Sequence, residues 1–370
     1  MKKTKSKLSF FTKLLLFINC GVALCLLISY LAPVTDPRKF WPVAFFGLAY
    51  PPVLLLNVLF VIYWIVARSK FVLISIVTIV AGYGVLRNNI GFSFGSDNVR
   101  FRQAGHMRVL TYNVHNFRKD GKVDHDSTRH GILQLMSDIK PDVIGMQEYF
   151  YREKGRYAMN DSISDLLKTK YRHFEPNAQN EREGIGVCIF SRFPIISKGS
   201  VAVSPPGSGI QCIYADIKAE GKIIRFYSVH LQSIQFEAED YRYIDTITNS
   251  GKPDLSSTKR LGSKLKRAFL KRAEQVEIIK QHAEQCPYPY IISGDFNDTP
   301  TSFAVNIVAK GMQNAFRVKG FGLGRTYNGS FPNYQIDYVM ASEEFKVLSH
   351  NIVKAKLSDH YPVYADLILK

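Results

Sequence analysis

Cysteine is scarce in this 370-residue sequence, and its few copies follow no pattern. The five cysteines stand at positions 20, 25, 188, 212 and 286. No C-x-x-C pair occurs, and no cysteine has a histidine at the spacing of a zinc ligand. The three cysteines of the C-terminal part argue against a full disulfide framework and leave room for one pair at most. Cys188 and Cys286 adjoin apolar runs, so we expect them to be small core residues.

Acidic residues are nearly absent from the first 100 positions, which contain Asp36 and Asp97 against eleven lysines and arginines. Three long apolar runs occupy this part of the chain, at residues 10–31, 40–67 and 71–86. Because a helix needs about 20 apolar residues to cross a bilayer, the first two runs are long enough and the third is marginal. We therefore predict a membrane anchor over residues 1–87 with three transmembrane helices, the second kinked or split by Pro51 and Pro52.

A cleaved signal peptide is the alternative interpretation of the first run. The run is too long for the apolar core of a signal peptide, and no small-x-small cleavage site follows it. Two further runs come after it, which favours a retained anchor. No carboxylate and no charge pair lies inside the runs, so a transport pathway is not indicated.

The flanking positive charges predict the orientation of the anchor. Lysines at positions 2, 3, 5, 7 and 13 and the pair Arg68 and Lys70 indicate the cytoplasmic side. Three crossings of the cell (inner) membrane then place the rest of the chain in the extracytoplasmic or periplasmic space. If the third run does not cross, the same counting places it in the cytoplasm.

Residues 88–106 mix Asn, Gly, Ser and Arg without a period and predict a linker. From residue 107 to 370, β-rich runs alternate with amphipathic helical patterns, as in an α/β domain. Residues 231–258 are polar and predicted to be irregular. The segment Lys259–Arg272 that follows contains seven basic residues and no acid on a helical apolar stripe. The solvated face of a packed helix is the favoured interpretation, and a surface for anionic lipid head groups is the alternative.

Polar side chains end several of the β-rich runs of this domain. Eight of them are candidates for a site: Asn113, Glu148, His230, Asp295, Asn297, Asp337, Asp359 and His360. Carboxylate and amide oxygens with few histidines suit a hard cation such as Mg²⁺ or Mn²⁺. Hydrolysis of a phosphoester needs a cation for the phosphate charge, a group that activates water and a group that stabilises the leaving oxygen.

Six short motifs in order carry a family resemblance. They are TYN at 111–113, MQE at 146–148, SVHL at 228–231, GDFN at 294–297, IDYV at 336–339 and SDH at 358–360. In this set and order they resemble the endonuclease/exonuclease/phosphatase superfamily over about residues 107–370. The resemblance implies a four-layer αββα sandwich of two mostly antiparallel sheets, here preceded by transmembrane helices.

The resemblance also implies a metal site. Glu148 would be the main ligand of Mg²⁺, with Mn²⁺ as a substitute, and Asn113 would assist it. Asp359 would be a further ligand or would support one. Arg325 and Tyr327, in a Gly/Asn-rich loop, are candidates for binding the substrate.

The remaining motif residues would carry the catalytic steps of an in-line attack of water on phosphorus. Asp295 would orient or deprotonate the water, and Asn297 would hold the phosphate. His230 would contact the scissile phosphate or assist the leaving group. His360 would stabilise the transition state, and Asp337 would keep it protonated.

The substrate class stays open on these residues. A phosphodiester in nucleic acid or phospholipid is the main expectation, and a phosphomonoesterase for inositol or lipid phosphates is an alternative. A catalytically inactive binding module with the same fold is another, which the intact set of motif residues argues against. The bilayer is the expected partner of the N-terminal helices, and we infer no protein partner.

Overall fold

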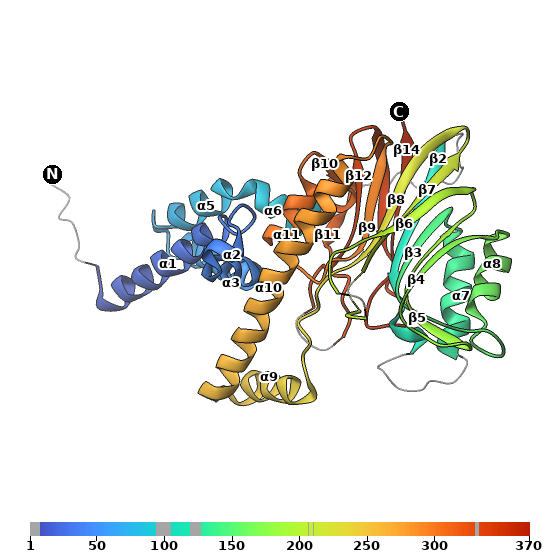
Figure 1. The fold of residues 1–370 in the computed structure, drawn as a ribbon. Helices are drawn as coiled ribbons and strands as arrows, with labels where there is room; N and C mark the ends of the chain where they lie inside the picture. The colour runs from blue at the N-terminus through green and yellow to red at the C-terminus, as the bar shows by residue number, and fades with distance from the viewer. Residues whose placement is uncertain (1–7, 94–104, 119–126, 206, 210, 330–332) are drawn as a thin grey trace.

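The computed structural model describes residues 8–93, 105–118, 127–205, 207–209, 211–329 and 333–370. Figure 1 shows a group of helices at the N-terminal end beside a sandwich of two sheets. The strands of the first sheet are β2 His106–Asn113, β3 Val143–Arg152, β4 Tyr171–Gln179, β5 Glu183–Ser191, β13 Phe345–Ile352 and β14 Val363–Leu369. Those of the second are β6 Ile195–Val201, β7 Gln211–Ala219, β8 Lys222–His230, β9 Tyr290–Asp295, β10 Met312–Asn314 and β12 Asp337–Ser342.

The first sheet has the strand order β13-β14-β2-β3-β5-β4, and the second has β10-β12-β9-β8-β7-β6. Within the described residues each sheet contains one parallel pair, β2–β3 in the first and β8–β9 in the second. The other neighbours pair antiparallel. The carboxyl ends of parallel strands lie at the same edge of a sheet. Each parallel pair therefore brings two polar strand ends together.

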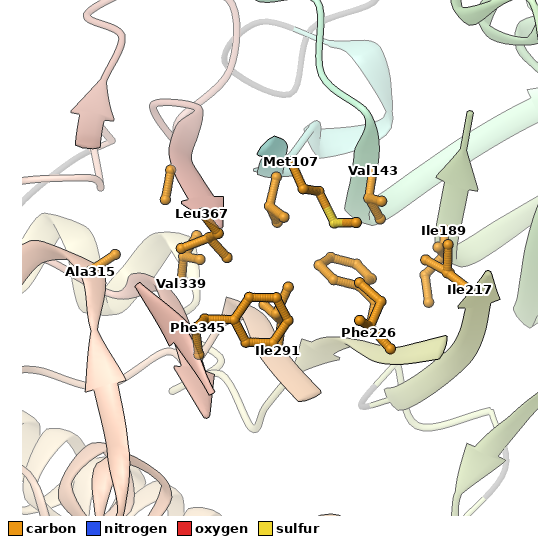
Figure 2. Close-up of a cluster of buried hydrophobic side chains, with 14 of the residues drawn as sticks. Met107, Val143, Ile189, Ile217, Phe226, Ile291, Ala315, Val339, Phe345 and Leu367 are labelled. Atoms are coloured by element: carbon orange, nitrogen blue, oxygen red, sulfur yellow. The ribbon is translucent and has the colours of Figure 1, made fainter. Parts of the chain in front are cut away.

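Alternating apolar side chains of the two sheets face each other and form the central core. Val143 and Ile189 of the first sheet meet Phe226 and Ile291 of the second, all with 0% exposure (Figure 2). Burial of each such side chain contributes about 1.5–3 kcal/mol. The packed core keeps the strand ends at the site in fixed positions.

Helices cover the outer faces of both sheets. On the first sheet lie α7 Ser127–Ile139 and α8 Met159–Leu167, and on the second lie α10 Leu255–Glu284 and α11 Phe303–Ala309. Their apolar stripes pack on the sheets through Ile132 and Ile163 on one side and Val276 and Val305 on the other. The predicted four-layer αββα sandwich is confirmed.

The N-terminal region consists of short and long helices. They are α1 Phe10–Ser29, α2 Pro37–Phe40, α3 Pro42–Leu48, α4 Tyr50–Val66, α5 Val72–Ala81 and α6 Tyr83–Asn89. By length and composition α1 is able to cross a membrane, and up to three spans result if the bent pairs α3–α4 (62°) and α5–α6 (72°) each count as one. The predicted split of the second run is confirmed, because Pro51 and Pro52 lie in the first turn of α4.

A buried polar network ties three of these helices together. The Asn19 side chain of α1 donates to Ser75 Oγ of α5 (2.7 Å) and accepts from Trp64 Nε1 of α4 (2.9 Å). Asn19 and Ser75 have 0% exposure. One amide thus satisfies partners on two other helices and sets how the three pack.

The helices α2 and α3 pack against the sandwich through α10. Arg38 donates to Glu277 (2.8 Å), and the rings of Phe45 and Phe269 meet edge to face at 5.3 Å. Gly47 faces the backbone of Thr301, where a Cβ would lie 3.2 Å from the carbonyl oxygen. Only a residue without a side chain allows this approach.

The stretch predicted as a linker also holds structure. Its residues 90–92 form β1 (Ile90–Phe92), which pairs antiparallel with β11 (Phe321–Leu323). Asn89, at the end of α6, donates to the Thr301 hydroxyl (3.0 Å). Residues 94–104 of the predicted linker lie outside the described residues. The helical region is therefore joined to the sandwich by contacts before and after α4 and α5.

The prediction of an irregular segment at 231–258 is wrong for residues 238–250 and 255–258, which are helical. Residues Ala238–Ser250 form α9, whose start is capped by Glu237 and Asp240 and which ends at Gly251 with φ 63°. The side chains of these two acids accept hydrogen bonds from backbone N–H groups at the start of the helix. In Figure 1, α9 and the adjoining end of α10 project from the sandwich.

The predicted solvated face of the basic helix is only partly present. On α10, Arg260 and Lys264 both bond the buried Asp240 of α9, at 2.9 and 2.6 Å. Arg272 is 1% exposed and lies 2.9 Å from Asp298. Three of the seven cations therefore hold the fold together. A short helix, α12 Ala315–Lys319, and a 3-10 turn, His115–Phe117, complete the described elements.

Candidate active site

The candidate site lies where polar strand ends of both sheets meet. In the second sheet His230, at the end of β8, is in register with Asp295, at the end of β9. The antiparallel neighbour β12 begins with Asp337, which stands opposite Asp295. In the first sheet Asn113 ends β2 beside β3, which carries Glu148. The topology brings these five residues to one edge of the sandwich.

The backbone around the site adopts rare conformations. Glu148 has φ 49° at a bulge of β3 between Met146 and Tyr149, and Asn297 has φ 52°. Gly294 has φ 146°, and a Cβ there would overlap the Val229 carbonyl. Such conformations cost about 1–3 kcal/mol for residues with a side chain, and bulges redirect side chains. The fold thus aims Glu148 and Asp295 into a common space.

Asp295 is the centre of the hydrogen-bond network. Its carboxylate is 1% exposed and accepts from the Asn297 backbone N–H (2.8 Å) and from Asn113 Nδ2 (3.2 Å). The Nε2 atoms of His360 and His230 lie 3.7 and 3.8 Å from it. Burial raises the pKa of Asp295, although the nearby His360 lowers it. A carboxylate with a raised pKa is suited to accepting a proton from water near neutral pH.

His360 and Asp337 form a buried pair. His360 Nδ1 lies 3.0 Å from Asp337 Oδ2, and both residues are at most 4% exposed. Burial opposes charge on His360, but Asp337 and Asp295 outweigh it and raise the pKa of the imidazole well above its usual value. His360 is therefore an imidazolium at neutral pH, with Nε2 directed toward Asp295. The pairing also explains how Asp337 is tolerated inside a strand.

Glu148 is the accessible carboxylate of the site. Its side chain is 34% exposed, and Asn113 Nδ2 donates to it at 3.1 Å. The amide oxygen of Asn113 accepts from the His115 N–H (3.1 Å), so Asn113 presents its nitrogen to Glu148 and its oxygen to the backbone. The amide must rotate before its oxygen can ligate a cation beside Glu148. In this arrangement Asn113 holds both Glu148 and Asp295 in place.

Two groups of side chains have the composition of a metal site. One joins Glu148 with the amide of Asn113. The other is Asp295, Asp337 and His360, whose ligand atoms lie within 4.8 Å of one another. A protonated imidazole has no lone pair for a metal, so the second group would hold a cation only after His360 loses its proton. The donor chemistry of the first, oxygens on an accessible carboxylate, fits a hard cation.

His115 was missed at the level of sequence and belongs to the site. Its Nδ1 lies 2.9 Å from Asp359 Oδ1. Burial acts against the charge of Asp359, but the bond from His115 dominates and brings its pKa down to about 2; the same bond raises the pKa of His115. His115 stands two positions after Asn113, the last residue of the TYN motif, and this closeness to the motif was the available signal. His115 also has a positive φ of 44°.

A cavity of about 300 Å³ opens over these groups. Seven of the predicted residues line it: Glu148, His230, Asp295, Asn297, Tyr327, Asp359 and His360. Asn113 and Asp337 stand behind this lining and are buried. The Tyr327 ring meets the His360 ring edge to face at 5.3 Å. Arg325 is exposed and is not among the described lining residues.

The comparisons with known proteins agree with this geometry. The model of the Endonuclease/Exonuclease/phosphatase family matches residues 110–360. The chain belongs to this family. A family described as a domain of unknown function matches residues 12–89, which include most of the N-terminal helices. A search of curated proteins found no match.

Solved structures of the endonuclease/exonuclease/phosphatase family share the fold. A family protein from Bacteroides thetaiotaomicron is 19% identical with a TM-score of 0.52, covering 73% of this chain and 100% of its own. One from Beutenbergia cavernae is 20% identical with a TM-score of 0.50, covering 71% and 72%. The human Nocturnin catalytic domain, solved with a bound sulfate anion, is 14% identical with a TM-score of 0.50, covering 73% and 97%. At these identities the likeness concerns the fold alone.

Membership in the endonuclease/exonuclease/phosphatase family makes this chain a hydrolase of phosphoester bonds in the general sense. The family comparison and the acidic strand ends also agree in pointing to a metal site. The matched residues 110–360 contain all eight motif residues predicted for the site.

Proposed function

We propose that this chain hydrolyses phosphodiesters by in-line attack of an activated water in the presence of Mg²⁺ or Mn²⁺. The observation that supports it best is the convergence of Glu148, Asp295 and the His360–Asp337 pair on one cavity. These groups supply an accessible carboxylate, a proton acceptor and a buried cationic donor. They are the three elements that phosphoester hydrolysis needs.

In this proposal Glu148 is the main ligand of the cation. Asn113 assists it after its amide rotates, and Asp359 is a further ligand or supports one. When bound, the cation neutralises charge on the phosphate and favours attack at phosphorus. His115 keeps Asp359 ionised and oriented, because its bond lowers the pKa of that carboxyl.

The other roles are assigned to groups on this chain. Asp295 orients the water and accepts its proton, which its raised pKa favours. The His360 imidazolium donates from Nε2 to a phosphate oxygen and stabilises the charge of the transition state. His230 contacts the phosphate or assists the leaving group. Asn297 donates to Asp295 and Leu231, so it shapes the loop beside the phosphate as well as reaching the cavity.

We further propose that the catalytic domain lies on the extracytoplasmic side of the cell membrane. Arg38 follows α1 and contacts Glu277 of the domain, so the segment after α1 shares a side with the domain. The number of crossings between them, contributed by α4 and α5, is then even. Whether α4 and α5 both cross or neither does, the single crossing by α1 separates the lysine-rich N-terminus from the domain. Lysines beside a membrane helix favour the cytoplasmic side. The proposed side of the domain therefore no longer depends on whether the third apolar run crosses the membrane.

The orientation is tested by labelling. In a chain with its native cysteines replaced by serine, the exposed Leu255 on α10 is changed to cysteine. A maleimide that does not cross membranes should label this residue in intact cells. Labelling that requires lysis would contradict the placement.

The activity is tested with the full chain in detergent micelles and bis-(p-nitrophenyl) phosphate. Mg²⁺ or Mn²⁺ should stimulate release of nitrophenolate. Glu148→Gln and His360→Gln should each reduce kcat/KM by about 10²–10⁴, the range for loss of a charged catalytic group. Glu153→Gln, exposed just beyond the end of β3, is the matched control and should be unchanged.

Failure of the metal to stimulate hydrolysis, with no effect of either substitution, would favour the inactive binding module. Parallel assays with p-nitrophenyl phosphate address the phosphomonoesterase alternative. A higher kcat/KM on this monoester than on the diester would move the proposal to phosphomonoesters.

A further inference from the structure

The cavity over the catalytic groups has two different walls. Its floor carries the carboxylates and histidines described above. A second part of the lining, the apolar wall, is largely apolar and aromatic and is formed by Leu48, Ile234, Phe236, Tyr241, Leu265 and Phe269. A phosphate alone needs none of this surface. The second wall therefore indicates a substrate with an apolar part beyond the phosphate.

Part of this apolar wall comes from the N-terminal helices. Leu48 ends α3, at the 62° bend between α3 and α4. It lines the cavity together with Leu265 and Phe269 of α10, and Phe45 of α3 packs on Phe269. Lys266 of α10 covers the Trp41 ring at 4.7 Å. The region that carries the membrane-crossing candidate α1 thus completes the pocket in which the chemistry occurs.

The scarcity of unpaired positive side chains around the cavity argues against a polyanionic substrate. Apart from the histidines of the site, the basic side chain among the described lining residues is Arg272, and its guanidinium lies 2.9 Å from Asp298 and bonds the Asn297 and Gln232 carbonyls. Lys264 on the same helix bonds Asp240. A nucleic acid needs several cations for its successive phosphates. This cavity offers one phosphate-sized polar floor and an apolar extension.

We propose that the substrate is a phosphate ester with a long hydrocarbon chain, a lipid, whose phosphate lies over Asp295 and whose chain lies along Leu48, Leu265 and Phe269. The proposal rests on the proposed hydrolysis and adds the substrate class to it. Leu48, at the break between α3 and α4, connects the cavity lining to the N-terminal helices. The apolar lining at Leu48 is therefore the expected entry for the hydrocarbon chain.

A series of alkyl p-nitrophenyl phosphates tests the proposal, because only the alkyl chain changes. Water attacks phosphorus, the bond to the nitrophenyl oxygen breaks, nitrophenolate leaves, and Asp295 takes the proton of the water. We use methyl, hexyl and dodecyl esters with the full chain in micelles at constant detergent. Each methylene buried on the apolar wall is worth up to about fourfold in kcat/KM. Partial burial should still raise kcat/KM at least about tenfold from methyl to dodecyl.

The quantity that decides is the dodecyl-to-methyl ratio of kcat/KM in each variant. Leu265→Asn and Leu48→Asn, both half-buried and from separate segments, should each reduce this ratio by about three- to tenfold. Ile278→Asn is the matched control, since Ile278 lies on α10 but is 39% exposed and outside the cavity lining. Its ratio should equal that of the unaltered chain. Using two variants keeps the test decisive if one of them does not fold.

The outcomes separate this inference from the proposed function. Equal kcat/KM for methyl and dodecyl esters would overturn the lipid substrate and leave hydrolysis intact. A chain-length ratio that is the same in every variant would reflect partition into micelles and would also overturn it. No hydrolysis of any ester would remove the proposed function itself.

A second experiment distinguishes lipid phosphomonoesters from lipid phosphodiesters as substrates. Dodecyl phosphate, a monoester, and its diester with glycerol share the phosphate and the chain. Release of inorganic phosphate from the monoester, and of glycerol or dodecanol from the diester, identifies which bond is cut. Cleavage of either, lowered by Leu265→Asn, supports the proposal, and cleavage of neither overturns it.

Discussion

The N-terminal helices and the sandwich distribute polar and apolar side chains in opposite ways between surface and interior. In the helices the outward surface is apolar, with Phe10, Phe17 and Val66 exposed by 83, 78 and 78%, while Asn19 and Ser75 are buried. In the sandwich the interior is mainly apolar, and buried charges away from the cavity, such as Asp216 and Asp366, are paired with arginines. A surface is matched to its solvent. The difference teaches that α1, by length and composition, is suited to contact with lipid and the sandwich to contact with water.

The two regions also differ in what they bury. The helices bury neutral amides and hydroxyls, which hydrogen bonds to one or two partners satisfy. The sandwich buries charged groups such as Arg272 and Asp298, each of which has the opposite charge of the other as its partner. Removal of one partner should therefore be far more damaging in the sandwich.

The largest effect is expected for Arg272→Met. The substitution keeps the length of the side chain but leaves Asp298 buried without its cation, and burial already raises the pKa of that carboxyl. The free energy of unfolding should fall by about 3–5 kcal/mol. Lys271→Met, the exposed neighbour with an exposed partner in Glu274, should lose at most about 1 kcal/mol. Chemical denaturation in micelles measures both, and equal losses would contradict the comparison.

A pH titration should give the second-largest effect. Burial lowers the pKa of His350, on β13, to about 4, so the unfolded chain takes up a proton first as the pH falls below about 6.5. The stabilisation from neutral His350 is present above 6.5 and is lost as the pH falls toward 4. Between pH 7 and pH 5 this residue should remove about 2 kcal/mol of unfolding free energy.

The His350→Gln variant isolates that titration, because glutamine does not change charge in this range. Its unfolding free energy should depend less on pH than that of the unaltered chain by the same amount. If the two chains show parallel pH dependence, His350 is not the buried neutral base that the structure shows. The amides and hydroxyls buried in the N-terminal helices do not titrate in this window.

The smallest effect is expected for Asn19→Leu. The change leaves Trp64 Nε1 and Ser75 Oγ without their bonds but suits an apolar surrounding. The helical region should lose about 1 kcal/mol, the scale of hydrogen bonds between helices in a bilayer. Thermal unfolding followed by tryptophan fluorescence reports the loss, and Cys20→Leu at the exposed neighbour is the control. A loss as large as that of Arg272→Met would erase the distinction between the regions.

Residues at strand ends were predictable from the sequence because strand patterns and motif order are local. Both the sandwich and the gathering of Asp295, His360 and Glu148 on one cavity follow from that order and the family resemblance. The paired Asp337 was also foreseen. The roles of these residues remain predictions for the assays above.

Features that depend on distant contacts were not predictable. His115 belongs to the site only because Asp359, far along the chain, lies beside it. The helix α9 has few apolar residues, and bonds from Arg260 and Lys264 to Asp240 hold it in place. The contribution of Leu48 to the cavity requires α3 to lie on α10, which no local pattern reveals.

Gly47 restricts which N-terminal helical segments can be combined with this sandwich. Its bare backbone lies against the Thr301 carbonyl, and the Ala32 side chain lies on the same side of it. A helical segment borrowed from another protein, with a larger residue at this position, would overlap Ala32 and press on the Thr301 carbonyl, and so shift α3 and the adjoining Leu48 of the cavity lining. Residues 12–89 and 110–360 match two separate families, yet at this contact they must change together.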